Sequence, residues 1–238
     1  MAIKLTTTAQ ASAENGVKAL VYSIAGAGKT TLAGTFGNLP TIIISAEAGL
    51  LSLAGKDIPV IEIGSVDDVS AAYQFLTETE EGKAFKAIVI DSISELAEVM
   101  LSSEKAATKD GRAAYGETNT KMMGMLRAFR DLQGRHVLFI AKLEKVKDET
   151  TGGLLYGPSM PGARLGQAIP YLTDLVFAIR VEKAEDGSIQ RYLQCQPDYN
   201  YQAKDRSGKL PLFFPPDMRK VIAVVTGEVT ADEALASV

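Results

Sequence analysis

Short apolar runs alternate with stretches of helical periodicity along most of the 238-residue chain. Continuous runs rich in Ile, Val and Leu are typical of strands that are covered on both faces of a sheet. Such strands are predicted, in chain order, at residues 18–23, 41–45, 59–63, 87–91, 136–141, 174–180 and 191–196. Strands that alternate with helices predict an α/β fold, a single domain in which a mainly parallel central sheet is flanked by helices.

Capping signals mark where helices begin. Ser65, with Asp68 three residues later, predicts a helix that runs to about Thr77, and Ser92 with Glu95 predicts a helix directly after the fourth strand. Further helices are predicted at residues 30–36, 117–133 and 215–225. Apolar side chains recur at helical spacing in the 117–133 segment, and we assign them to core packing.

The composition limits the class of protein. The chain has no apolar run near the roughly 20 residues needed to cross a bilayer, and its N-terminus lacks the apolar region of a signal peptide. A single cysteine, Cys195, excludes an internal disulfide and fits a reducing compartment. We therefore expect a cytoplasmic protein with no membrane partner. The 25 basic and 29 acidic residues give no global sign of nucleic-acid binding, although local patches decide that property.

A glycine-rich loop joins the first predicted strand to the first predicted helix. Residues 23–30 read Ser-Ile-Ala-Gly-Ala-Gly-Lys-Thr and match the phosphate-loop pattern G-x-x-x-x-G-K-[ST], except that Ser23 replaces the first glycine. In such a loop backbone N–H groups face the phosphates of a nucleotide, Lys29 reaches the β- and γ-phosphates, and the Thr30 hydroxyl ligates Mg²⁺. The predicted ATP-binding residues of the loop are Ser23, Gly26, Ala27, Gly28, Lys29, Thr30 and Thr31. The alternative, a chance glycine-rich turn, is disfavoured because a strand and a helix flank the motif.

Two acidic residues follow other strands at the same edge of the predicted sheet. Asp91 ends the fourth strand, where an acid would bind Mg²⁺ together with Thr30, although an aspartate there is otherwise an ordinary turn or helix cap. Glu47 follows the second strand and would orient or deprotonate the water that attacks the terminal phosphate. The alternative for Glu47 is a solvated loop acid. ATP and Mg²⁺ are thus the predicted cofactors of a P-loop ATPase.

The order of these parts resembles the ATPase core of the RecA family. Residues 44–50, Ile-Ser-Ala-Glu-Ala-Gly-Leu, are similar to the strand that carries that family's catalytic glutamate, and Val-Ile-Asp-Ser at 89–92 and Leu-Phe-Ile-Ala at 138–141 follow in the same order. The similarity spans roughly residues 18–210 and looks closest to small phage-encoded RecA-core proteins. It implies an ATP-hydrolysing DNA recombination protein that assembles on single-stranded DNA, promotes annealing or strand exchange, and resides in the host cytoplasm if phage-encoded.

The resemblance also implies roles for three cations. Residues 203–208, Ala-Lys-Asp-Arg-Ser-Gly, look like an element with which related ATPases reach into a neighbour's nucleotide site. Lys204 and Arg206 would then be catalytic fingers that act between subunits of a ring or filament, and a charged hairpin turn is the alternative. Lys142 stands where RecA-like proteins often carry a polar amide that senses the γ-phosphate. It would contact phosphate directly, but a lysine accepts no hydrogen bond.

Two predicted loops, residues 105–116 and 145–164, correspond to the mobile DNA-contacting loops of the family. Both carry cations, glycines and a tyrosine, which suit phosphate binding and base stacking. The candidate DNA contacts are Lys109, Arg112, Tyr115, Lys145, Lys147, Tyr156 and Arg164. Solvated flexible loops are the alternative, and Asp148 and Glu149 weaken the second patch. A single-strand-binding protein is a candidate partner.

Three segments are predicted. Residues 17–226 form the ATPase core, residues 1–16 precede it, and residues 227–238 form a flexible acidic tail. Residues 3–9 have spare β-propensity and, as in RecA-like filaments, would add to the sheet edge of a neighbouring subunit. Two other functions stay open. One is an ATP-switched DNA-binding scaffold with vestigial hydrolysis, which the departures at Ser23 and Lys142 favour, and the other is a small-molecule phosphotransferase.

Overall fold

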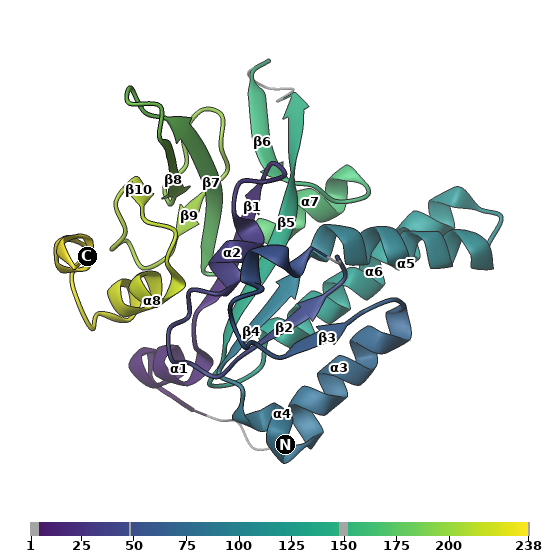
Figure 1. Ribbon diagram of the computed structural model, residues 1–238. Helices are drawn as coiled ribbons and strands as arrows, with labels where there is room; N and C mark the ends of the chain where they lie inside the picture. The colour runs from purple at the N-terminus through teal and green to yellow at the C-terminus, as the bar shows by residue number, and fades with distance from the viewer. Residues whose placement is uncertain (1–4, 48, 148–151, 238) are drawn as a thin grey trace.

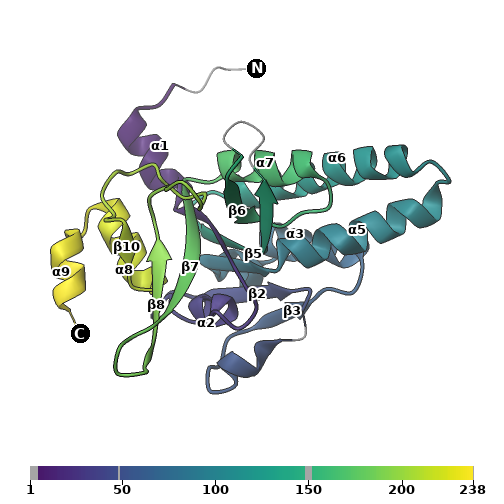
Figure 2. The ribbon, with the colours of Figure 1, turned by 90° about the horizontal axis from the view of Figure 1, so that it is seen from above.

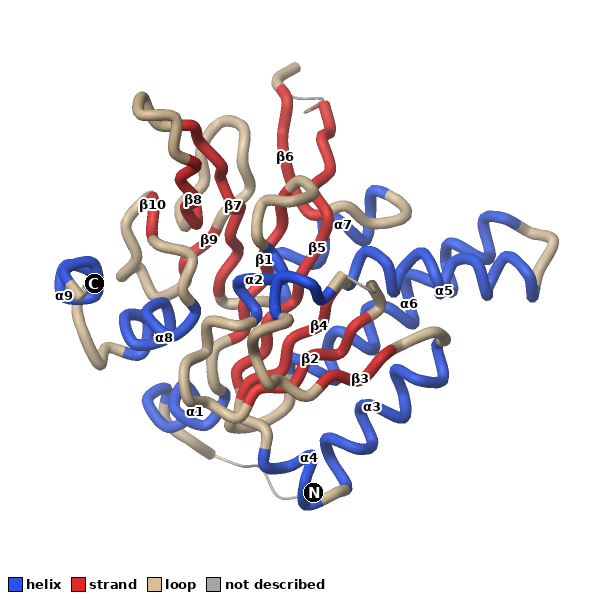
Figure 3. Tube along the Cα trace, in the orientation of Figure 1, coloured by secondary structure: helices blue, strands red, loops and turns tan. Residues whose placement is uncertain are grey.

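The computed structural model describes residues 5–47, 49–147 and 152–237, and in this part of the chain the fold is the α/β fold that the sequence predicts (Figure 1, Figure 3). The strands, in chain order, are β1 (Lys18–Ser23), β2 (Thr41–Ser45), β3 (Val60–Glu62), β4 (Ala87–Asp91), β5 (His136–Lys147), β6 (Leu154–Pro158), β7 (Leu175–Lys183), β8 (Ile189–Gln194), β9 (Lys204–Asp205) and β10 (Phe213–Phe214). The helices are α1 (Thr8–Asn15), α2 (Lys29–Ala33), the 3-10 helix η1 (Leu50–Leu53), α3 (Val66–Glu78), α4 (Glu80–Ala84), α5 (Ile93–Ala107), α6 (Gly111–Arg130), α7 (Ala163–Leu172), α8 (Met218–Thr226) and α9 (Ala231–Ala236).

One central sheet organises these elements, with the strand order β10-β8-β7-β1-β5-β4-β2-β3. Neighbouring strands from β7 to β3 in this order run parallel. Strands β8 and β10 continue the sheet in antiparallel fashion, and β6 and β9 pair antiparallel with β5 and β7. The sheet is therefore mainly parallel, as predicted. Because the carboxyl ends of parallel strands lie at one edge of a sheet, the segments that follow β1, β2, β4 and the parallel part of β5 meet at that edge.

Helices cover both faces of the sheet, and each face has its own apolar core (Figure 1, Figure 2). Helices α3, α5, α6 and α7 pack on one face, where the apolar stripe expected in α6 is buried at Met122, Leu126 and Phe129. Helices α2 and α8 pack on the other face through Leu32 and Val221. Strands β1, β2 and β4 are buried at every position, which explains their continuous apolar runs.

The first segment predicted to be a mobile loop is largely helical. The Asp110 side chain accepts hydrogen bonds from the backbone N–H groups of Arg112 and Ala113 and so caps α6 at Gly111. The helix thus begins earlier than the predicted residue 117, and Arg112 and Tyr115 lie on it. With α5, it forms a helical hairpin that projects to the side of the sheet (Figure 1).

The second segment predicted to be a loop is mostly a β-hairpin. Strand β5 continues past the sheet to Lys147 and pairs with β6, for example Lys145 with Tyr156. Arg164 lies near the start of α7. Residues 148–151, which include Asp148 and Glu149, lie outside the described residues. The sequence did not predict this hairpin, because the glycines and charged residues that are typical of a loop also occur in an exposed pair of strands.

The two ends of the chain also differ from the prediction. Thr7 and Gln10 form a capping box at the start of α1, so residues 8 and 9 of the expected β-arm are helical, and residues 1–4 lie outside the described residues. The expected flexible tail contains α9, which Thr230 and Glu233 cap and whose Ala234 is buried. Within the described residues, no helix is long and apolar enough to cross a membrane.

Candidate nucleotide-binding site

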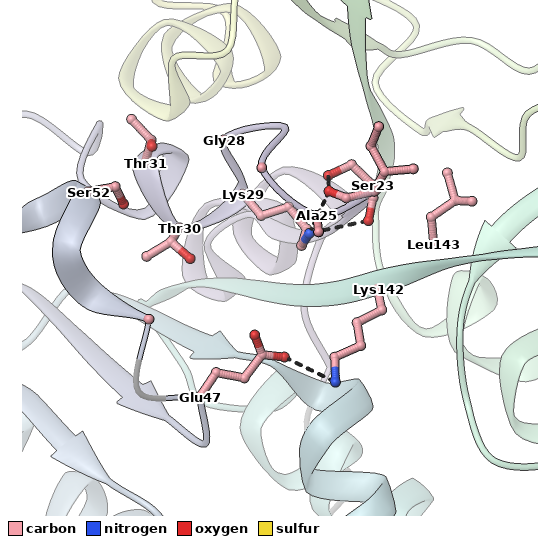
Figure 4. A pocket seen from close by; sticks show the side chains of 13 residues that line it. Ser23, Ala25, Gly28, Lys29, Thr30, Thr31, Glu47, Ser52, Lys142 and Leu143 are labelled. Carbon is pink, nitrogen blue, oxygen red and sulfur yellow. Dashed lines mark hydrogen bonds and ion pairs between the residues drawn. The ribbon is translucent and has the colours of Figure 1, made fainter.

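The glycine-rich loop lies between β1 and α2, at the carboxyl edge of the parallel strands. Gly26 and Gly28 have φ angles of 74° and 104°, which favour glycine, and the carbonyl of Gly28 accepts the first helical hydrogen bond, from Leu32. A cavity of about 500 Å³ lies against this loop (Figure 4). Gly26, Gly28, Thr30 and Thr31 line the cavity. The loop thus has the shape that its sequence predicts.

Two predicted loop residues are buried, Ala27 beneath the loop and Ser23 at the edge of the cavity. Ala27 is buried in the apolar cluster beneath the loop, so its contribution to a ligand is limited to its backbone. Ser23 is buried at the end of β1, and its hydroxyl donates to the carbonyl of Ile24 at 3.1 Å. The serine at the first position of the pattern thus forms a hydrogen bond within the loop.

Lys29 is held inside the loop by backbone carbonyls. Its Nζ donates to the carbonyl oxygens of Ser23 and Ile24 at 3.2 and 3.0 Å. Burial lowers the pKa of this ammonium, and the nearby carboxylates of Asp91 and Glu47 oppose that change. A phosphate group in the cavity would offer Lys29 a charged acceptor in place of two neutral ones, which is a stronger hydrogen-bond partner.

Thr30 and Asp91 come together as the sequence predicts. The Thr30 hydroxyl donates to Oδ2 of Asp91 at 2.7 Å, and Asp91 is buried at the end of β4. Burial raises the pKa of the Asp91 carboxyl, although the hydrogen bond from Thr30 opposes the rise. A hydroxyl and a carboxylate are oxygen ligands of the kind Mg²⁺ prefers, and such sites usually take further ligands from substrate phosphates and water. The described residues hold no cluster of three or more His, Cys, Asp or Glu that would bind a metal without such help.

Glu47 reaches the cavity from the segment after β2 and is held there by two neighbours. The Ser92 hydroxyl donates to its Oε1 at 2.5 Å, and Nζ of Lys142 lies 3.6 Å from the same oxygen (Figure 4). The backbone of Glu47 is fixed as well, since its carbonyl accepts the Ser45 hydroxyl at 2.5 Å. Glu47 is thus an oriented, partly exposed carboxylate in the cavity wall.

Lys142 lines the cavity at the end of the parallel part of β5. Its Nζ forms an ion pair with Oε2 of Glu95 at 2.5 Å, and this hydrogen bond is the main reason that the pKa of Lys142 is raised. Its backbone N–H donates to the Ser94 hydroxyl at 2.9 Å, and Ser94 donates to the carbonyl of Ser159 at 2.7 Å. Lys142 therefore places its ammonium beside Glu47 and is tied to the start of α5.

The sequence did not identify three residues that contact Glu47 or Lys142, namely Ser92, Ser94 and Glu95. Ser92 and Glu95 are a capping pair for α5, and that local role hides their contacts with Glu47 and Lys142. Ser94 carries no sequence signal for its bridge between α5, β5 and the segment after β6. The one clue was position, because all three follow Asp91 directly at the edge where the cavity lies.

Lys204 and Arg206 lie away from this cavity, at the opposite edge of the sheet. Strand β9 pairs with the first residues of β7, whose amino end faces away from the loop. Nζ of Lys204 donates to the carbonyl of Pro170 at 2.6 Å, and Nη1 of Arg206 pairs with Oδ1 of Asp174 at 2.9 Å. Neither cation belongs to the nucleotide site of its own chain.

The predicted DNA-contact residues divide into exposed cations and rings that already have partners. Lys109, Arg112, Lys145, Lys147 and Arg164 are exposed. The ring of Tyr156 is stacked on Tyr201 at a centroid distance of 4.7 Å, and Nζ of Lys145 lies 5.8 Å from the Tyr156 centroid. Tyr115 is 39% exposed, with Nζ of Lys105 at 5.2 Å from its centroid. Tyr115 therefore offers more free ring surface than Tyr156.

Comparison with known proteins bears on the family of the chain. A search among curated proteins finds no match. A family model described as an AAA domain matches residues 15–207, which include the glycine-rich loop, Glu47, Asp91 and Lys142. The chain therefore belongs to this AAA-domain family and is a P-loop NTPase.

Proposed function

We propose that the protein is an ATP-hydrolysing DNA recombination protein that assembles on single-stranded DNA and promotes annealing or strand exchange. The hydrolytic half of this proposal follows from the cavity. Lys29 would donate to the β- and γ-phosphates of ATP, and Glu47 would accept a proton from the attacking water or orient it. Mg²⁺ bound through Thr30 and Asp91 would neutralise charge on the phosphates.

The neighbours of Glu47 suit the role of a water-orienting group. Ser92 donates to one carboxylate oxygen of Glu47, so the other oxygen stays available for water. Nζ of Lys142, 3.6 Å from the same oxygen, is a second neighbour that orients the carboxylate. A carboxylate fixed by two neighbours loses little freedom when water and substrate bind, which favours catalysis.

The observation that carries the DNA-dependent half is that two elements run directly from the cavity to two projections that carry exposed cations. Helix α5 begins next to the cavity, where Ser92 and Glu95 contact the cavity-lining Glu47 and Lys142. It ends at Ala107, at the hairpin that carries Lys109 and Arg112. Strand β5 passes Lys142 at the cavity and continues to Lys147 in the β5–β6 hairpin. DNA that shifts either hairpin would therefore move a residue next to Glu47.

The charges and rings on the projections support single-stranded DNA as the ligand. Exposed lysines and arginines bind phosphates without regard to sequence, and an exposed tyrosine can stack on a base. Tyr115 and Arg112 lie near one another on the first turns of α6, with Lys109 just before the helix. The stacked Tyr156 and Tyr201 pair is better suited to stiffening the second hairpin than to receiving a base.

The test is steady-state ATP hydrolysis with and without single-stranded DNA at several salt concentrations, for the wild type and for a Lys109→Gln/Arg112→Gln double variant. We expect DNA to stimulate the wild type and the stimulation to fall with salt. The double variant should bind DNA with a salt slope about 1.4 smaller, since each phosphate contact on a single strand contributes about 0.7.

A Lys83→Gln/Arg127→Gln variant is the matched control, because it removes the same charge from exposed positions on α4 and α6 away from the hairpin tip. A wild-type rate that DNA leaves unchanged would contradict a recombination role and favour a phosphotransferase. DNA binding without measurable ATP turnover would instead favour the ATP-switched scaffold.

A further inference from the structure

The β7–β8 hairpin extends beyond the sheet and flanks the glycine-rich loop. Strands β1 and β7 are parallel neighbours, with Tyr22 level with Ala178. Strand β1 ends one residue later at Ser23, whereas β7 continues to Lys183 and β8 returns antiparallel to it. The outer half of the hairpin therefore lies at the level of the loop, and Figure 2 shows β8 passing beside α2.

One cation of this hairpin reaches the loop. Arg191 pairs with Val181 across the hairpin and lies on the same face of β8 as Leu193, which is buried with Leu32 of α2. A β-carbon placed on Gly28 would lie 3.5 Å from Cδ and 3.7 Å from Nε of Arg191. The guanidinium is thus next to the glycine that precedes Lys29.

Arg191 has no counter-charge in the described part of the chain. The side chain is exposed, and no hydrogen bond, ion pair or aromatic contact joins it to another described residue. By contrast, Arg180 on the neighbouring strand donates to Gln194 at 2.7 Å and stacks on Tyr201. An arginine at a phosphate-binding loop that lacks a partner from its own chain is available for an anion, and its planar fork suits phosphate oxygens.

The strand order says which phosphates Arg191 would meet. Glu47, which the proposed function places at the terminal phosphate, follows β2. Asp91 ends β4 and Lys142 lies on β5, and all three strands are on one side of β1. Strand β8 lies on the other side of β1, beyond β7. A nucleotide whose terminal phosphate faces Glu47 therefore extends its other phosphates toward Arg191.

We infer that Arg191 is a phosphate-binding residue that acts within its own chain and contacts the α- or β-phosphate of the nucleotide seated on the loop. This inference rests on the nucleotide site of the proposed function, and it adds a contact outside the glycine-rich motif. Because these phosphates remain after hydrolysis, Arg191 holds ADP and ATP alike. The hairpin then acts as one wall of the site, opposite the wall formed by Glu47 and Lys142.

The test is isothermal titration calorimetry of the full chain with ADP and with a non-hydrolysable ATP analogue, in the presence of Mg²⁺. Removing a charge-assisted hydrogen bond should raise both dissociation constants about tenfold or more in Arg191→Gln. Arg191→Lys keeps the charge and loses the fork, so its affinities should fall between those of Arg191→Gln and the wild type. Lys183→Gln is the control, since it removes one positive charge from the same hairpin and should change either constant less than twofold.

The outcomes separate this inference from the proposed function. Unchanged affinities in Arg191→Gln, with a wild type that binds both nucleotides, would overturn the role of Arg191 alone. Weaker binding of the ATP analogue with ADP unaffected would place Arg191 at the terminal phosphate and overturn the assignment made here. A wild type that binds neither nucleotide would overturn the nucleotide site itself. Thermal unfolding without nucleotide checks the fold, and Arg191→Lys provides the comparison if Arg191→Gln is destabilised.

Discussion

The position of Glu47 gives the sharpest residue-level prediction. Glu47→Gln keeps the size of the side chain and its contact with Ser92 but removes the proton acceptor, so the turnover number should fall about 10²- to 10⁴-fold. The dissociation constant of this variant for ADP should stay within a few-fold of the wild type, because the proposed function places Glu47 at the terminal phosphate, which ADP lacks. Single-turnover hydrolysis and calorimetry measure the two effects separately. Turnover that survives the substitution would show that another group activates the water.

Lys18 supplies a second residue-level prediction, on stability. It is 5% exposed, its Nζ donates to the carbonyls of Leu132 and Arg135, and burial lowers its pKa from 10.5 to about 8. The unfolded chain therefore binds more protons than the folded chain between about pH 8 and 10.5, and the contribution of Lys18 to the free energy of unfolding rises with pH across this window.

The measurement is urea unfolding of the wild type and Lys18→Met at about pH 7.5 and pH 9.5. The wild type should gain about 2 kcal/mol relative to the variant between these pH values, at about 1.4 kcal/mol for each unit of pKa shift. Subtraction removes the groups that titrate in both proteins. A difference that does not change with pH would mean that the Lys18 ammonium keeps an ordinary pKa in the fold.

How much of the site could be predicted depends on whether a residue's chemistry is local. Lys29, Thr30 and Asp91 were predicted because the spacing of the loop and the end of an apolar strand are features of contiguous sequence. Ser92, by contrast, contacts Glu47 across 45 positions of sequence. This contact was not predicted, because capping of α5 is already a sufficient reason for a serine at this position. Arg191 looked like an ordinary polar position of an alternating strand, because only the strand order brings it to the loop.

At the scale of elements, Ser94 connects the cavity to the α5–α6 hairpin and to the β5–β6 hairpin. Its buried hydroxyl accepts the Lys142 N–H and donates to the Ser159 carbonyl, so it ties α5 to β5 and to the segment after β6. Ser94→Ala would leave both backbone groups without this partner and should lower the free energy of unfolding by about 1–3 kcal/mol. Ser103→Ala, at an exposed position of the same helix, should change it little. Equal effects of the two changes in urea unfolding would contradict a special role for Ser94.

Element boundaries were predictable where caps and apolar periodicity coincided. The capping pairs of α3 and α5 gave their first residues correctly. The start of α6 was missed because Asp110 is followed by glycine, arginine and alanines, which carry no apolar stripe. The tail was misjudged on composition, although Thr230 and Glu233 form the same kind of capping box that identifies the other helices. The extension of β5 past the sheet has no periodic signal, because its partner β6 supplies the pairing.

At the scale of the whole molecule, the nucleotide cavity has exposed apolar residues at its rim. Ile24 lines the cavity and is 58% exposed, and Leu51, next to the cavity-lining Ser52, is 89% exposed. Lys204 and Arg206 lie at the opposite edge of the sheet. A second copy that placed its own Arg206 edge on this rim would cover the apolar residues and bring a cation to the phosphates, and repetition of this head-to-tail contact generates a ring or filament.

This geometry predicts complementation between two inactive variants. Lys29→Ala removes the lysine proposed to bind phosphate but keeps Arg206, and Arg206→Gln keeps the loop but removes the proposed finger. Each should be nearly inactive alone, whereas an equimolar mixture should regain about a quarter of wild-type turnover, because that share of random head-to-tail contacts pairs an intact loop with an intact finger. The ion pair of Arg206 with Asp174 is exposed, so its loss should cost less than about 1 kcal/mol and leave the fold intact. A mixture no more active than either variant alone would mean that Arg206 does not act in a neighbouring subunit. Full activity of Arg206→Gln alone would mean that Arg206 has no role in catalysis.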